Sequence, residues 1–240
     1  MFGIEDKYIV NSHFKPTDFV HKELSRADKK RIKETIKSGI LKYQIKGEEI
    51  PSIINETYNY QVIMFLEIEL NNLKSATYLN NILQKEVIKA PCVFKFYDIS
   101  SCCYAFADKR LSMQEEQTIV LDNTFVTTPQ PINAKLDARL LYENIKNKNN
   151  KRSFYMELMI KAYVLNNSKL IQDLTTIFDT NIWYNEAKKI EFFCKLKELQ
   201  GLKDKQAKTV VAQEKVELNT RMKNLIQELQ SYYKEQTVGA

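Results

Sequence analysis

The chain has few of the residues that interrupt regular structure. Its 240 residues include only 5 Gly and 5 Pro, which favours long helices over a loop-rich, all-β fold. The five glycines are isolated from one another along the sequence. A Gly-rich phosphate-binding loop is therefore excluded, and with it ATP or dinucleotide binding through a familiar loop of that kind.

Histidine is also scarce, and the two that occur form no catalytic arrangement. His13 and His21 have no carboxylate or cysteine nearby at a spacing that catalysis uses, and the chain contains no Gly-x-Ser-x-Gly turn. With no motif for a nucleophile or a cofactor, we interpret the chain as a non-enzyme that needs no cofactor.

The four cysteines have neither the spacing of a zinc site nor the density of a disulfide framework. They are Cys92, Cys102, Cys103 and Cys194. Cys102 and Cys103 are adjacent in an apolar run, where one side chain would point inward and the other outward on a strand. We expect plain buried or half-buried thiols and no metal site.

Long hydrophobic runs are missing as well. No window approaches eighteen uncharged apolar residues, so no membrane span and no membrane partner are expected. The first twenty residues mix acidic and basic side chains and lack the layout of a signal peptide. With 44% hydrophobic and 28% charged residues, the chain has the composition of a globular protein with a core, and we expect it in the cytoplasm.

The first half of the chain predicts an α+β domain over residues 1–130. In order, the expected elements are a helix over 25–38, strands over 40–45 and 58–70, a helix over 71–90, and strands over 92–97, 102–107 and 118–128. The helix start at Ser25 follows from its capping side chain, and Ser38 and Gly39 would end that helix. The order indicates a small mixed sheet with helices.

The β pattern disappears after the Pro-Gln-Pro sequence at 129–131, which we take as a domain boundary. A helical segment over 131–184 would contain short helices at 137–145, 153–165 and 169–178. Residues 185–236 then predict a long helix or helical hairpin, with a bend near Gly201.

An apolar seam runs along the last helix. Its members are Val211, Leu218, Met222, Leu225 and Leu229, followed by Tyr232. This spacing places them on one side of a coiled-coil-like helix whose other positions are polar. Such a seam needs a partner, which can be the same chain, a second copy or another protein. The seam therefore predicts assembly, and its five members are candidate interface residues.

Basic residues decorate the first predicted helix. They are Arg26, Lys29, Lys30, Arg31, Lys33 and Lys37. The net charge of the chain is only +6, so for nucleic-acid binding the positions of the charges matter more than their total. Such a face can contact DNA phosphates and release their counterions, although an ordinary solvated helix looks the same. A small DNA-binding protein is one alternative function.

Glu67 and Glu69 lie two apart on the clearest strand, so both side chains leave the same face. Nucleases of the restriction-endonuclease fold have an acidic strand that is followed by a helix and then by another strand, and carboxylates on the acidic strand hold Mg²⁺. Here Glu69 stands where such enzymes carry a lysine, and Glu56 is only a stand-in for the upstream acid. Ile63 and Phe65 share this face, so the simpler interpretation is that the two glutamates lie at its solvated end. A metal-dependent nuclease is the second alternative function.

Three segments carry a resemblance to a known family: residues 62–70, 89–96 and 213–219. Through them the chain resembles, over roughly its whole length, a bacterial family catalogued as domain of unknown function 4391. The Lys-Val-Glu-Leu-Asn sequence at 215–219 is the most specific part. The resemblance assigns no catalytic residues.

The resemblance also implies a setting, because members are encoded near helicases and DNA methyltransferases of restriction-type or anti-phage systems. Our leading hypothesis is therefore a non-catalytic accessory subunit of a DNA-handling defence complex. It would bind a helicase or methyltransferase and assemble through its C-terminal helices, with self-association and direct DNA contact as further expectations.

Overall fold

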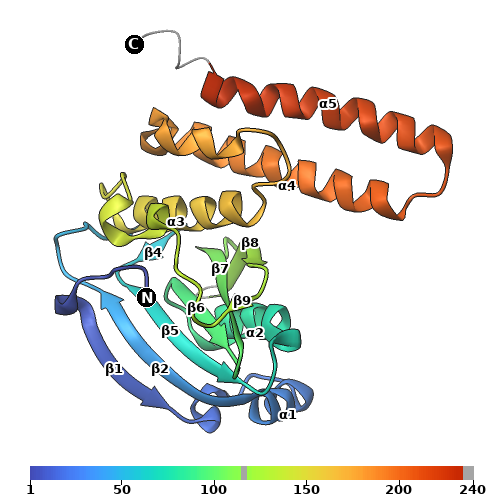
Figure 1. Ribbon diagram of the computed structural model, residues 1–240. Coiled ribbons are helices and arrows are strands. Elements are labelled where there is room, and N and C mark those ends of the chain that lie inside the picture. The colour runs from blue at the N-terminus through green and yellow to red at the C-terminus, as the bar shows by residue number, and fades with distance from the viewer. Residues whose placement is uncertain (115–117, 235–240) are drawn as a thin grey trace. The chain divides into compact units, whose positions relative to one another are not determined.

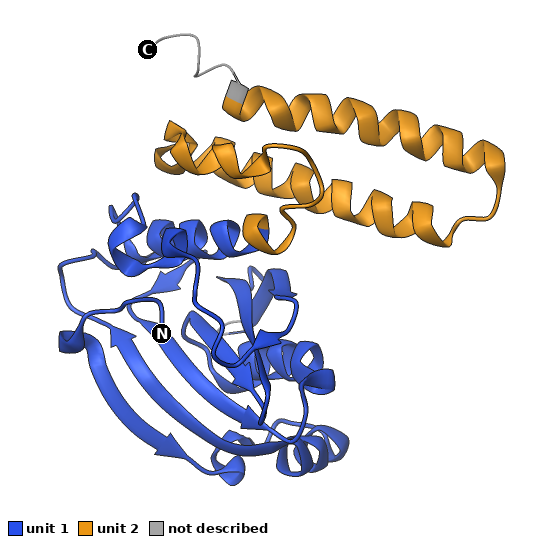
Figure 2. Ribbon diagram, viewed as in Figure 1, with its two compact units in different colours: residues 1–163 blue, residues 164–240 orange. Residues whose placement is uncertain are grey.

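The computed structural model of the chain describes residues 1–114 and 118–234 (Figure 1). Its internal contacts divide the chain into two compact units, Met1–Tyr163 and Val164–Ala240 (Figure 2). The first unit combines a sheet with helices and the second is helical, so the chain is of the α+β class.

Unit 1 is built on a mixed sheet of seven strands. The sheet order is β1 (Ile9–Phe14), β2 (Ile36–Ile45), β5 (Ile63–Leu70), β6 (Cys92–Tyr97), β7 (Ser101–Leu111) and β8 (Ile119–Val126), with β9 (Gln130–Pro131) also paired to β7. Strands β3 (Ile53–Ile54) and β4 (Asn59–Tyr60) form a separate pair. Only β5 and β6 are parallel among the described pairs. Parallel neighbours need a crossover, and the chain supplies it as α2 (Ala76–Ile82) with the π-helical turn η4 (Leu83–Val87).

The predicted boundary at 129–131 and the observed division differ. Because β9 pairs with β7, the Pro-Gln-Pro sequence belongs to the sheet of unit 1. The following segment, expected as a helix over 137–145, forms two 3₁₀ turns, η5 (Ala138–Leu140) and η6 (Tyr142–Asn144). Helix α3 (Lys151–Asn166) then closes the unit, and the division comes near its end.

The first helix begins as predicted but ends earlier. In α1 (Arg26–Thr35) the Ser25 hydroxyl accepts the N–H of Asp28, which confirms the cap. Ile36 does not continue the helix, because it opens β2 and pairs with Leu70 of β5. Gly39 does not stop the helix either. It lies within β2, where a Cβ would come 2.7 Å from the ring of Phe19, so close packing explains the glycine.

Short 3₁₀ turns join the remaining elements of unit 1. They are η1 (Asp6–Tyr8), η2 (Pro16–Phe19) and η3 (Leu73–Ser75). The predicted strand over 92–97 is confirmed as β6, and the one over 102–107 extends into the longer β7. The long strand expected over 58–70 is divided, because β4 ends at Tyr60 and β5 starts at Ile63.

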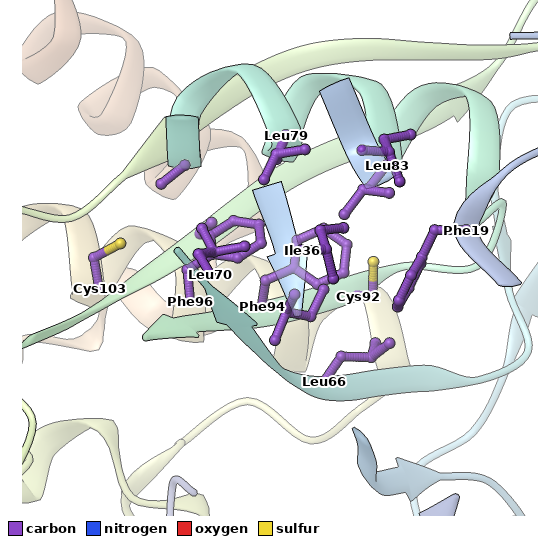
Figure 3. Packing of buried hydrophobic residues seen from close by; sticks show 14 of the residues in the cluster. Phe19, Ile36, Leu66, Leu70, Leu79, Leu83, Cys92, Phe94, Phe96 and Cys103 are labelled. Atoms are coloured by element: carbon purple, nitrogen blue, oxygen red, sulfur yellow. The ribbon is translucent and has the colours of Figure 1, made fainter. Parts of the chain in front are cut away.

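The main core lies on one face of the sheet, beneath α2. Leu66 and Leu70 of β5 and Phe94 of β6 pack with Leu79 of α2 and Leu83 of η4 (Figure 3). Because side chains alternate along a strand, the odd-numbered residues of β5 face the other way. There the Phe65 ring lies 6.0 Å from that of Phe2.

Unit 2 is a helical hairpin preceded by two 3₁₀ turns. The turns are η7 (Leu174–Asp179) and η8 (Asn181–Tyr184), and the helices are α4 (Glu186–Lys208) and α5 (Ala212–Lys234). The break between the helices falls at residues 209–211, not near Gly201, which lies inside α4. Residues 235 and 236, which end the predicted segment, lie outside the described residues. None of the described helices is long and apolar enough to cross a membrane.

Candidate functional site

The acidic pair lies at the centre of the sheet in unit 1. On β5, Glu67 stands between Ile40 of β2 and Lys95 of β6, and Glu69 stands between Ser38 and Tyr97 of the same strands. Both carboxylates project from the face that carries Phe65, beyond its apolar part. The structure therefore brings Glu67 and Glu69 together, as predicted.

Each of the two carboxylates has a lysine partner from a neighbouring strand. The Lys95 Nζ lies 3.5 Å from an oxygen of Glu67, and both side chains are only about one-fifth exposed. The Lys37 Nζ lies 3.2 Å from Glu69, which also accepts a hydrogen bond from the Ser38 hydroxyl at 3.4 Å. Each carboxylate thus has a lysine charge beside it.

Tyrosines surround the acidic pair. Burial, and then the charges of Glu69 and Glu67, raise the pKa of Tyr97, while burial and Glu67 raise that of Tyr43. The pKa of Tyr104 rises to about 12, mainly through burial. All three hydroxyls therefore stay protonated at neutral pH and can donate hydrogen bonds to a polar group.

A metal site is not completed at this position. Among the described residues there is no group of three or more His, Cys, Asp or Glu side chains that could hold a metal ion. Glu56, the stand-in for the upstream acid, lies between β3 and β4 and so belongs to the other strand pair. Glu67 and Glu69 remain as two lysine-paired carboxylates.

The basic residues assigned to the first helix do not form one free surface. The Lys29 ammonium donates to the carbonyl of Lys22 at 2.8 Å, and the Arg31 guanidinium lies 4.0 Å from the ring centroid of Tyr78. Lys37 lies on β2 and pairs with Glu69, which corrects its assignment to the helix. The exposed basic residues of α1 are Arg26, Lys30, Arg31 and Lys33.

The apolar seam of the last helix is closed within its own chain. Leu218, Met222, Leu225 and Leu229 are all buried. Three ion pairs join α4 to α5, which run antiparallel. They are Lys195 with Glu228, Glu198 with Arg221, and Lys205 with Glu214. The sequence left three possible partners for the seam, and in the structure the partner is the same chain. These four residues are therefore not an open interface, which corrects their assignment.

The fifth seam residue behaves differently. Val211 lies in the connection between α4 and α5 and is 56% exposed. Val210 beside it is 90% exposed, and Val216, in the first turns of α5, is 64% exposed. We call Val210, Val211 and Val216 the valine end of the hairpin.

Sequence reasoning missed the role of Lys95. Its only local signal is a lone charge between Phe94 and Phe96 in a strand that is otherwise apolar. A lysine at such a position needs a counter-charge, but the parallel register that supplies Glu67 is visible only in the structure.

The family is shown by comparison with protein-family models. Residues 2–229 match the family described as Domain of unknown function (DUF4391), and the chain belongs to this family. The resemblance inferred from residues 62–70, 89–96 and 213–219 is thereby confirmed. Neither a curated protein nor a solved structure matches the chain.

Proposed function

We propose that the chain is a non-catalytic accessory subunit of a bacterial, cytoplasmic DNA-handling complex of the restriction or anti-phage type. Its partner would be a helicase or a DNA methyltransferase, the class that the family resemblance implies. The structural observation that carries the proposal is the exposed valine end of the hairpin in unit 2.

Three branched apolar side chains within seven residues of the chain are each more than half exposed. Single exposed apolar residues are common, whereas a group of them in one short segment is typical of a surface that binds another molecule. Because the seam is buried inside the hairpin, α4 and α5 would pack as an antiparallel coiled coil and present Val210, Val211 and Val216 without unfolding. Covering each valine would contribute on the order of 1 kcal/mol or more to binding.

The central face of the sheet supports a non-catalytic role. Glu67 and Glu69 are each balanced by a lysine, at 3.5 and 3.2 Å. Each lysine offsets the negative charge that would attract a metal ion to its carboxylate, and among the described residues no third acidic side chain, histidine or cysteine completes a metal-binding group there.

The test is co-purification from the native cell with the full chain tagged. We expect a helicase or methyltransferase to co-purify with the wild type and to be lost with the double variant Val210→Asp and Val216→Asp. The matched control is Thr220→Asp with Asn224→Asp, which adds the same charge at exposed positions of α5. Retention of the partner by the first variant, or capture of neither protein class, would contradict the proposal.

A metal-dependent nuclease is the second candidate, and one observation favours it. The chain lacks the lysine of a Glu-x-Lys sequence, but Lys95 from β6 reaches within 3.5 Å of Glu67. In this function Glu67 and Glu69 would hold Mg²⁺ and Lys95 would stabilise an attacking water. Incubation with DNA and Mg²⁺ or Mn²⁺ should then give cleavage that Glu69→Gln abolishes and Glu34→Gln leaves intact. No cleavage by the wild type removes this candidate.

A further inference from the structure

A cavity of about 570 Å³ opens on unit 1, away from the acidic pair. Its wall is formed by β4 and the segment after it, the connection from η4 to β6, and the ends of β7 and β8. Its charged lining residues are Lys89, Lys109 and Arg110, and it also contains the side-chain amides of Asn59 and Gln61. Of the described residues that line it, none is acidic.

Lys109 is a buried cation without a carboxylate partner among the described residues. Its side chain is 3% exposed, and its Nζ donates to the carbonyls of Ile88 and Ala90 and lies 3.8 Å from the Cys92 sulfur. Burial lowers the pKa of this lysine. The carbonyls satisfy its hydrogen bonds and tie the η4 connection to β7, but they do not balance its charge. A bound anion would supply the missing counter-charge.

The other two cations make the cavity wall more positive. Lys89 is exposed, and Arg110 pairs through its Nε with Asp122 at 2.9 Å. Counted over the described part of the chain, these two cations and Lys109 give three positive charges here against the one negative charge of Asp122. A surface of this kind attracts an anion, and lysine and arginine are the usual partners of phosphate.

The remaining lining residues suit a flat ring with a polar edge. Val62 and Ile119 are apolar, and the carboxamides of Asn59 and Gln61 stand beside them. Each carboxamide offers a donor and an acceptor in one plane, which matches the edge of a nucleobase. Neither side chain is engaged by another described residue. The volume lies within the range of about 300–1,000 Å³ that small-molecule sites have.

We infer that this cavity binds a nucleotide, with the phosphate against Lys89 and Arg110 and near the buried charge of Lys109, and the base against Val62, Ile119 and the two carboxamides. The nucleotide can be free or part of a single strand, since both present the same base and phosphate. The inference is independent of the proposed partner, because no residue of the cavity belongs to the hairpin.

The experiment is calorimetric titration of the full chain with three probes: dAMP, inorganic phosphate and a short single-stranded oligonucleotide of deoxyadenosine. We expect dAMP to bind more tightly than phosphate. Gln61→Ala and Lys89→Ala, both at exposed positions, should each weaken nucleotide binding by up to about tenfold, the size of one lost hydrogen bond. Lys85→Ala is the matched control, because Lys85 lies on η4, pairs with Glu86 and does not line the cavity.

The two sources of nucleotide separate in the same titrations. If the oligonucleotide binds and both variants weaken it, a single strand is a source, whereas binding of dAMP alone indicates a free nucleotide. The inference is overturned if no probe binds, if phosphate binds as tightly as dAMP, or if Gln61→Ala and Lys89→Ala leave binding unchanged. Failure here leaves co-purification through the valine end unaffected, so the two proposals can fail separately.

Discussion

At the scale of single residues, the charges inside unit 1 are held by specific partners. The clearest case is Glu157 of α3, which accepts the backbone N–H groups of Lys146 and Asn147 at 2.8 and 2.7 Å. The Lys161 Nζ lies 2.6 Å from the same carboxylate, and both side chains are almost fully buried. Burial lowers the pKa of Lys161, and the carboxylate of Glu157 opposes part of this shift.

Replacing Glu157 should therefore be costly. Glu157→Gln keeps the size of the side chain but removes the charge opposite Lys161, and we expect the free energy of unfolding to fall by about 3–5 kcal/mol. Urea unfolding measures this change, and Glu143→Gln, at an exposed position nearby, is the control. A loss below about 1 kcal/mol, the size typical of an exposed ion pair, would contradict this account of the buried pair.

At the scale of elements, the seam of α5 stabilises the hairpin and is not available to another protein. Leu225 is buried, whereas Val216 on the same helix is 64% exposed. Introducing aspartate at Leu218 and Leu225 would consequently disrupt α4 and α5 themselves, so it does not report on an intermolecular contact.

Leu225→Ala tests the closed seam. Removing a buried leucine side chain leaves a cavity, and we expect unit 2 to lose about 2–5 kcal/mol of stability. Val216→Ala should change it by less than about 0.5 kcal/mol, because surface substitutions have small effects. Urea unfolding followed by helical circular dichroism compares the two. Equal effects would show that the seam is not closed in solution.

Helix α1 is the element on which DNA contact can be tested. Arg26, Lys30 and Lys33 are exposed, and the triple variant to glutamate should reduce the salt dependence of DNA binding by up to about three in the log–log slope. The control replaces Lys208, Lys215 and Lys223, which are exposed residues of unit 2, with glutamate. Binding measured over a range of salt distinguishes a local contact from an effect of net charge. The same slope in both variants would remove α1 as a DNA-binding face.

At the scale of the whole molecule, the closed seam predicts a monomer in the absence of a partner. With Leu218, Met222, Leu225 and Leu229 buried within the chain, no long apolar stripe of α5 is left to pair with a second copy. Light scattering of the isolated full chain should give a mass of about 28.2 kDa. A mass near twice that value would show that another surface joins two copies. Substitutions at the valine end would then be the first test of which surface it is.

The residue patterns of the chain predicted part of its local structure. The cap at Ser25, the strand at 92–97 and the α+β class followed from residue type and spacing, because periodicity records which side of an element is buried. The same spacing showed that α5 has a buried seam. It could not show what covers the seam, since that information lies in α4.

The pairings between elements emerged only from the folded chain. Lys95 meets Glu67 and Lys37 meets Glu69 because β2, β5 and β6 are neighbours in one sheet, with registers set by contacts far apart in the sequence. Gly39 illustrates the same limit, because an apparent helix stop is in fact a strand residue that makes room for Phe19. Periodicity is a local property, whereas the charge balance of the acidic pair and the cavity around Lys109 depend on which distant segments the core brings together.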